Sequence, residues 1–169
     1  MPNWCMNRLI LSHEDPKQIE KASRAIRKNR LFQSFHPCPR ALTNTMSGFH
    51  ADPVLRTAHE RKQARNVAKY GFKDWYGWRL AKWDTKWDIC ASEIQEKHKD
   101  EITVSFDTAW SPPIAFYEKM VELGFSVKAF YSEPGMGFAG YWNDGESHQV
   151  ELNGDEDEHN ISEEWSRTL

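Results

Sequence analysis

Two short segments combine carboxylates with large aromatic residues, which is the composition of a polar site. The first is Trp83-Asp84-Thr85-Lys86-Trp87-Asp88, and the second is Phe106-Asp107-Thr108-Ala109-Trp110-Ser111-Pro112-Pro113. Carboxylates that converge can hold a divalent cation or act as acid and base. One hypothesis is therefore a small carboxylate- or metal-dependent hydrolase or nuclease, whose catalytic residues would be Asp84, Asp88, Asp107 and Glu133.

The same two segments also have a purely structural interpretation. Asp and Thr side chains commonly hydrogen-bond turns and caps, and indole rings fill the space between helices and a sheet. In the functional alternative, indole rings and a lysine rim a pocket and bind a ligand without catalysis. The residues of that binding surface would be Trp83, Lys86, Trp87 and Trp110.

A basic segment at 52–70 is the second candidate surface. Asp52 as N-cap and Pro53 at the first helical position predict the start of a helix, and Gly71 predicts its end. Basic side chains can bind phosphates, and the rings that follow can stack on bases or simply anchor the segment. The candidate contact residues are Arg56, Arg61, Lys62, Arg65, Lys69, Trp75, Tyr76 and Trp78.

The net charge of −3 conceals an asymmetry between the two halves of the chain. Residues 1–87 contain 17 Lys/Arg and 7 Asp/Glu, whereas residues 88–169 contain 5 and 18. Folding can interleave the halves and cancel the difference. The alternative is a basic face for nucleic acid, or an acidic face at 144–158 for a basic partner.

Metal, cofactor and membrane signals are weak in this sequence. The spacing of His36, Cys38, His50 and His59 matches no zinc pattern, and no glycine-rich loop matches a nucleotide-binding fingerprint. We therefore expect no cofactor. Three widely spaced cysteines indicate reduced thiols, and the mean hydropathy of −0.77 argues against a membrane protein. With no signal-peptide pattern at the start, we expect a cytoplasmic location.

Periodicity predicts one domain, 1–169, of the α+β class. Dropping a central insertion, the order is strand, helix, strand, strand, helix, strand, followed by an added hairpin. That order is typical of a ferredoxin-like βαββαβ sandwich with an antiparallel sheet. We expect an inserted helical and aromatic lobe at 40–82 and an extra C-terminal hairpin. The predicted strands are 4–11, 87–94, 101–107, 125–131, 136–142 and 148–152; the predicted helices are 16–29, 52–70, 112–123 and 161–169, with a loop at 31–50 that contains a short strand at 32–35.

Several of these segments together resemble the YubB family, ferredoxin-like domain proteins of phages and conjugative plasmids. The resemblance is carried by residues 1–7, the two aromatic segments and Tyr131-Ser132-Glu133-Pro134-Gly135, in the same order along nearly the whole chain. One departure is Asp84, where the family pattern has glycine. The resemblance implies an accessory protein of a mobile genetic element and brings no activity or catalytic residues.

These observations favour a non-enzymatic binding protein over the hydrolase alternative. The expected partner is a host protein or nucleic acid, and the expected contact surface is the 40–82 lobe, because function often resides on segments added to a rigid scaffold. The sequence leaves the choice of partner and the oligomeric state open.

Overall fold

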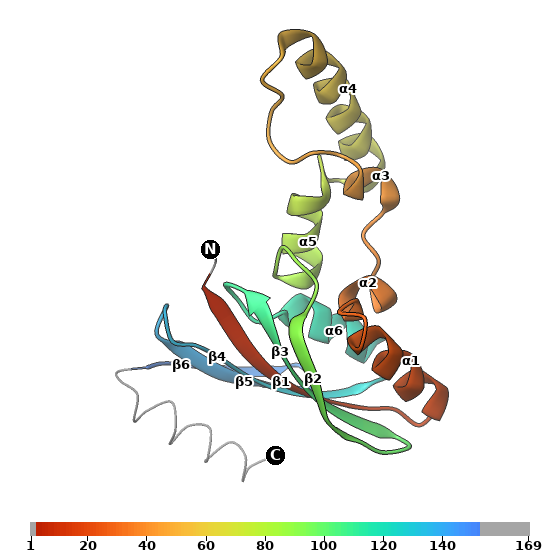
Figure 1. Cartoon of the computed structure of the whole chain (residues 1–169), viewed down its shortest axis with the longest axis vertical. Coiled ribbons are helices and arrows are strands. Elements are labelled where there is room, and N and C mark those ends of the chain that lie inside the picture. Colours follow the sequence, from red (N-terminus) through yellow and green to blue (C-terminus); the bar gives the residue numbers. More distant parts are fainter. Residues whose placement is uncertain (1–2, 153–169) are drawn as a thin grey trace.

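A six-stranded antiparallel sheet forms one layer of the molecule, in the order β2-β3-β1-β4-β5-β6 (Figure 1). The computed structural model describes residues 3–152. The elements in chain order are β1 (Trp4–Ser12), α1 (Pro16–Ile26), α2 (Leu31–Phe35), α3 (Arg40–Thr43), α4 (Pro53–Tyr70), α5 (Trp75–Trp83), β2 (Cys90–Lys97), β3 (Glu101–Ala109), α6 (Ile114–Glu122), β4 (Ser126–Glu133), β5 (Phe138–Asn143) and β6 (Glu146–Glu151).

Strand β1 lies at the centre of the sheet and pairs with β3 on one side and β4 on the other. Its buried residues alternate with more exposed ones, so that Cys5, Leu9 and Leu11 face the core with no exposed surface. The register places Leu9 opposite Val104 of β3 and Ala129 of β4. The prediction of an α+β fold with an antiparallel sheet is confirmed.

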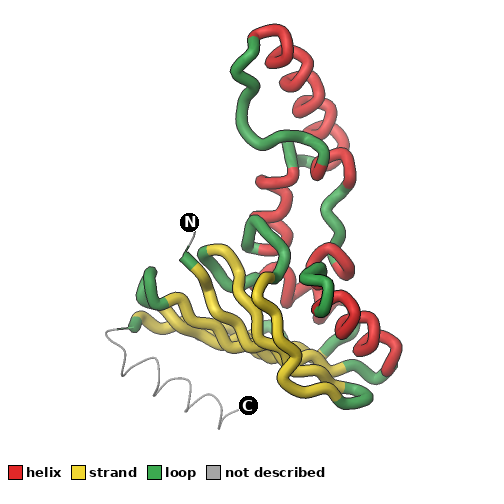
Figure 2. The backbone as a smooth tube through the Cα atoms, in the orientation of Figure 1, coloured by secondary structure: helices red, strands yellow, loops and turns green. Residues whose placement is uncertain are grey.

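Helices α1 and α6 pack on one face of the sheet and close the core (Figure 2). Asp15 caps α1 by accepting the backbone N–H of Lys17 at 2.9 Å, and Pro16 begins the helix as predicted. Ile19 and Ile26 are each 1% exposed and Ala22 is fully buried, as their spacing predicts. Each of these two helices therefore contributes one stripe of side chains to the core against one face of the sheet.

The segment after α1 corrects one prediction. The expected loop with a short strand at 32–35 is instead helix α2, and Leu31, Phe32 and Phe35 of this helix are buried. Its first backbone N–H groups are satisfied by Asp88, which lies far along the chain. A cap supplied from that distance leaves no signal in the local sequence.

The start of α6 corrects a second prediction. We expected a helix over 112–123, but α6 begins at Ile114. The Ser111 hydroxyl donates a hydrogen bond to the carbonyl oxygen of Asp84, so it ties the α5–β2 loop to the β3–α6 loop. Phe116, Tyr117 and Met120 form the buried stripe of this helix.

Residues 40–82 divide into a buried part and a projecting part. Helix α5 contributes Trp78 and Trp83 to the core, and α3 contributes Leu42. Helix α4 projects away from the sheet with the 44–52 segment beside it, and we call α4 together with residues 44–52 the arm (Figure 1). Asp52 caps α4 and Gly71 ends it at a φ of 78°.

The chain after β4 forms the expected hairpin, with β5 and β6 paired through a turn at Asp144 and Gly145. Both turn residues have positive φ, as a two-residue hairpin turn requires. The predicted helix at 161–169 lies outside the described residues, as does part of the acidic 144–158 region. Among residues 3–152, no helix is both long and apolar enough to cross a membrane.

Candidate functional site

Asp84 ends α5 and holds two helices together. It adopts a φ of 58°, a left-handed conformation that Asp tolerates better than most residues. Its carboxylate accepts a hydrogen bond of 2.6 Å from the backbone N–H of Ala115 in the first turn of α6. Burial raises the pKa of the Asp84 carboxyl, and the Ala115 N–H opposes this shift. The side chain therefore acts as a bridge between α5 and α6.

Asp88 has a similar role at α2. Its carboxylate accepts the backbone N–H groups of Phe32, Gln33 and Ile89, each at 2.9 Å. Burial raises the pKa of Asp88, while these three donors and Arg79 act to lower it. A carboxylate with three backbone donors is already satisfied, and its position is explained by the capping of α2.

The remaining carboxylates of the hydrolase hypothesis are also in structural positions. Glu133 is 1% exposed and accepts the backbone N–H of Met136 in the following turn. Asp107 lies opposite Met6 of β1 and Cys90 of β2, and burial raises its pKa. Residues 3–152 contain no group of three or more His, Cys, Asp or Glu side chains placed to hold a metal ion. The described residues therefore provide no carboxylate group of the kind that a metal-dependent hydrolase would require.

A cluster of exposed indoles surrounds Lys86 at the end of the sheet where β1 begins and β3 ends. The Lys86 ammonium lies 4.0 Å from the ring centroid of Trp87 and 3.8 Å from that of Trp110. Trp4 lies beside Trp87, with 6.1 Å between ring centroids. The three indoles are about two-fifths exposed. We call Trp4, Lys86, Trp87 and Trp110 the indole–lysine cluster.

The other predicted indoles are in the interior. Trp83 has no exposed surface and donates from Nε1 to the carbonyl oxygen of His36 at 2.9 Å, and Trp78 is 6% exposed. Trp75 is half-buried against the core, next to Tyr76. The structure therefore places Lys86, Trp87 and Trp110 at the surface and assigns Trp78 and Trp83 to packing.

The basic residues of the arm fall into two groups. Arg56 donates to the carbonyl oxygens of His50 and Ala51, and Lys62 donates to that of Asn44 at 2.6 Å. These two side chains fasten the 44–52 segment to α4. Asn66, the buried residue of the helix, donates to Thr45 and to the carbonyl oxygen of Lys73, both at 2.9 Å.

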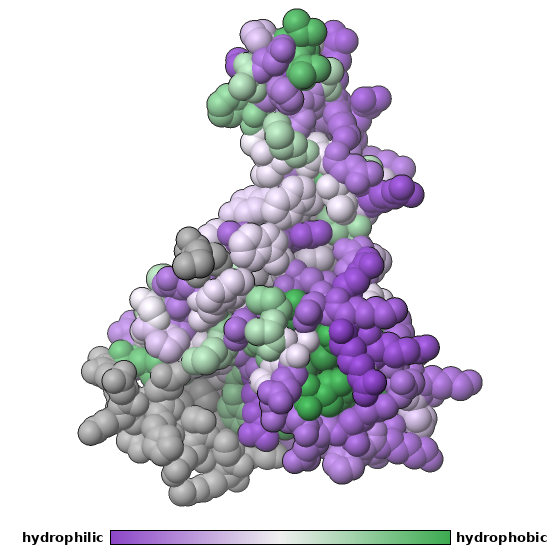
Figure 3. All heavy atoms as spheres, in the orientation of Figure 1, coloured by the Kyte–Doolittle hydropathy of each residue, from purple (hydrophilic) through white to green (hydrophobic). Residues whose placement is uncertain are grey.

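The second group forms a line along the helix. Arg61, Arg65 and Lys69 recur every four residues, so they lie on one face, and all three are exposed. Within residues 3–152 no ion pair involves any residue of α4. Figure 3 shows hydrophilic side chains along the arm and a hydrophobic group at its end, where Val54 and Leu55 are 79% and 51% exposed. We call Arg61, Arg65 and Lys69 the basic stripe.

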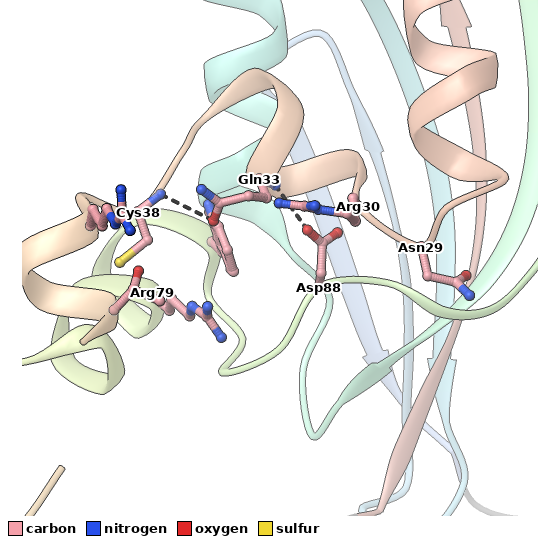
Figure 4. Close-up of a pocket in the computed structure, with 9 residues that line it drawn as sticks. Asn29, Arg30, Gln33, Cys38, Arg79 and Asp88 are labelled. Atoms are coloured by element: carbon pink, nitrogen blue, oxygen red, sulfur yellow. Dashed lines mark hydrogen bonds between the residues drawn. The ribbon is translucent and has the colours of Figure 1, made fainter. Parts of the chain in front are cut away.

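A cavity of about 420 Å³ lies where the arm joins the sheet and its helices (Figure 4). Residues of α2, α3 and α5, and of the α1–α2, α2–α3 and α5–β2 loops, line this space. Its polar lining includes Asn29, Arg30, Gln33, Arg40, Arg79 and Asp88. Sequence reasoning missed this site, because its arginines are spread over 50 residues and each looks like an isolated surface charge.

Arg79 is the most constrained of the cavity arginines. Its guanidinium carbon lies 5.0 Å from the ring centroid of Trp75 and 4.9 Å from that of Trp83. One terminal nitrogen donates to the carbonyl oxygen of Lys86 at 3.2 Å, while its Nε is buried without a hydrogen-bond partner. The guanidinium is held in place, and it forms no ion pair within residues 3–152.

The scattered His and Cys residues do not form a metal site in the described chain. The His36 ring packs edge-on against Trp78, and burial lowers its pKa, with Lys119 and Lys82 adding to the effect. His59 approaches the carbonyl oxygen of Gly48 at 3.1 Å, as part of the arm. All three cysteines are described, and none forms a disulfide.

No family model matches this chain, and no curated protein matches it. Among solved structures, it is similar to the crystal structure of protein api92 from Yersinia pseudotuberculosis, which is assigned to the family model DUF1281. The two share 9% sequence identity with a TM-score of 0.50, and the match covers 91% of this chain and 99% of the other. At this identity the likeness concerns the fold alone.

Proposed function

We propose that this protein is a non-enzymatic nucleic-acid-binding protein that contacts phosphates through the basic stripe of its arm. The observation that carries the proposal is the exposure of Arg61, Arg65 and Lys69 on one face of a projecting helix, without an acidic partner in residues 3–152. Helix α4 contains five basic residues and one acidic residue, Glu60. Such a concentration of positive charge attracts the phosphate backbone whatever the base sequence.

The indole–lysine cluster supplies a second kind of contact. Partly exposed indoles offer ring faces on which unpaired bases can stack, and such stacking tolerates any base. We therefore propose that single-stranded DNA or RNA is bound more tightly than duplex. The capping and turn roles of Asp84, Asp88 and Glu133 give the hydrolase alternative no support.

We also propose that the scaffold is a ferredoxin-like sandwich and that the protein serves a phage or conjugative plasmid in the host cytoplasm. The order β2-β3-β1-β4 with antiparallel pairing, and the helices between β1 and β2 and between β3 and β4, support the first part. The resemblance to the YubB family supports the second.

A binding titration with labelled single-stranded and duplex oligonucleotides at two salt concentrations tests the proposal. The test variant is R61Q/R65Q/K69Q. The matched control is K17Q/R24Q/K28Q, which removes the same charge from α1 and the turn that follows it. We expect the test variant to weaken binding and to reduce the dependence of log K on log salt by about 2 to 3, because three phosphate contacts are lost.

The control variant should leave the affinity within about twofold of the wild type, because its residues lie outside the arm. Equal losses in the two triple variants would show that only net charge matters and would overturn the assignment to the arm. If the wild type shows no salt-dependent affinity for DNA or RNA, the nucleic-acid proposal is wrong, and a host protein becomes the partner to test. A pull-down with the intact and arm-shortened chain would then identify it.

A further inference from the structure

Three arginines meet at the cavity beneath the arm, and none of them forms an ion pair within residues 3–152. Three guanidinium groups against the single lining carboxylate, Asp88, give the cavity a formal charge of +2. Asp88 forms no ion pair with them and directs its oxygens to three backbone N–H groups, so its single charge offsets only one of the three. Uncompensated positive charge gathered around a cavity is the usual arrangement for binding an anion.

The position of Arg79 adds geometric selectivity. Its guanidinium lies over two indole rings and donates to the carbonyl oxygen of Lys86, so the side chain is oriented before any ligand arrives. Guanidinium groups match the oxygens of phosphate and carboxylate with paired hydrogen bonds. A doubly charged anion fits a lining of +2 better than a singly charged one.

We propose that this cavity binds a phosphate monoester, the terminal phosphate of a nucleotide. Such a group carries a charge of about −1.5 to −2 at neutral pH, whereas an internal phosphodiester carries about −1. The cavity volume of about 420 Å³ lies in the range of small-molecule sites and leaves room for part of the sugar and base. The amide oxygens of Asn29 and Gln33 already accept hydrogen bonds from Ser92 and Cys38, and their amide N–H groups provide donors for a hydroxylated sugar.

The phosphate can come from two sources: a free mononucleotide or the 5′ end of a strand held by the arm. Binding of a strand end rests on the proposed function, whereas binding of a free mononucleotide does not.

Calorimetric titrations with inorganic phosphate, a nucleoside 5′-monophosphate and the unphosphorylated nucleoside test binding of the free mononucleotide. Paired oligonucleotides with 5′-phosphate and 5′-hydroxyl ends test binding of a strand end. We expect the phosphorylated member of each pair to bind at least about tenfold more tightly.

The variant R30Q/R40Q tests the location of the site. Arg30 and Arg40 are exposed at their helix starts, so their replacement should leave the fold intact, which circular dichroism and thermal unfolding will verify. We expect affinity for the 5′-monophosphate to fall about tenfold for each arginine. The matched control R24Q/K28Q, with the same charge change at one residue of α1 and one residue just after it, should bind like the wild type.

Each outcome bears on the proposal. If the 5′-phosphorylated oligonucleotide binds and the free mononucleotide does not, the result supports the proposal and assigns the cavity to strand ends. Equal binding of phosphorylated and unphosphorylated probes, no binding of any phosphorylated probe, or equal losses in R30Q/R40Q and R24Q/K28Q would overturn it. The arm variant R61Q/R65Q/K69Q should retain mononucleotide affinity, so failure of the arm proposal and failure of the cavity proposal are distinguishable.

Discussion

The carboxylate of Asp84 at the end of α5 accepts the backbone N–H of Ala115 in α6 at 2.6 Å. In return, the backbone carbonyl of Asp84 accepts the hydroxyl of Ser111. These two contacts join α5, which follows the arm along the chain, to the β3–α6 loop and to α6. Asp84 therefore fixes the end of α5 against the β3–α6 region at the point where the chain turns back toward the sheet.

Two replacements of Asp84 should separate the contribution of its carboxylate from that of its left-handed backbone conformation. D84A loses the carboxylate and leaves an alanine at a φ of 58°, so we expect destabilisation by about 2 kcal/mol. D84G loses the same carboxylate but adopts this φ without strain, so we expect a loss of about 1 kcal/mol. Urea unfolding of the two variants measures the difference. A D84G protein no more stable than D84A would contradict the role assigned to the backbone angle.

The indoles of the first aromatic segment should respond differently to truncation. W83F leaves a void in the core and the carbonyl oxygen of His36 without its donor, so we expect a loss of about 2–3 kcal/mol. W87F, at a site 40% exposed, should change the free energy of unfolding by less than about 1 kcal/mol. Chemical denaturation of both proteins gives the comparison, and similar values would refute the division between core and surface.

Two glycines provide a matched pair. A Cβ at Gly140 would overlap the ring of Tyr131 on the neighbouring strand, so we expect G140A to destabilise the protein by about 1–3 kcal/mol. A Cβ at Gly77 in α5 would lie 3.8 Å from Phe72, which is ordinary contact, so G77A should stabilise it by about 0.5–1 kcal/mol. Thermal unfolding should show melting temperatures shifted in opposite directions, and shifts of the same sign would count against this packing.

Stability should depend on pH through His36. Burial lowers the pKa of His36 in the folded protein below its usual value of 6.5. As the pH falls below 6.5, the unfolded chain binds the proton before the folded chain does, so this contribution to stability is present above pH 6.5 and is lost on acidification.

Urea midpoints at pH 7.5, 6.5 and 5.5 will test this dependence. H36Q should flatten the decline between pH 6.5 and 5.5, whereas H98Q, at an exposed position in the β2–β3 turn, should retain it. An unchanged decline in H36Q would assign the pH dependence to other groups.

The parts of the fold with local signals were predictable. The caps Asp15 and Asp52, the stop at Gly71 and the alternation in β1 follow from neighbouring residues, and the structure contains all of them. Helix α2 was not predictable, because Asp88 caps it from 55 and 56 residues away. The cavity was missed for the same reason, since tertiary structure brings its arginines together.

Candidate site residues were harder to judge than elements. Trp83 and Trp87 have the same side chain and lie four residues apart, yet one is fully buried and the other 40% exposed. Composition predicted that indoles gather near these turns, but the direction of each ring depends on the left-handed turn at Asp84. Likewise, only the contacts of Arg56 and Lys62 with the 44–52 segment distinguish them from the basic stripe.

The arm has a mechanical consequence. An α-helix of 18 residues is about 27 Å long, and it is fastened near its base by the amide of Asn66. A tilt of about 10° at that base would carry the far end through about 5 Å, roughly one helical turn, without disturbing the sheet. A small change of angle at the Asn66 contacts would therefore shift the far end of the arm by about the distance between neighbouring phosphates.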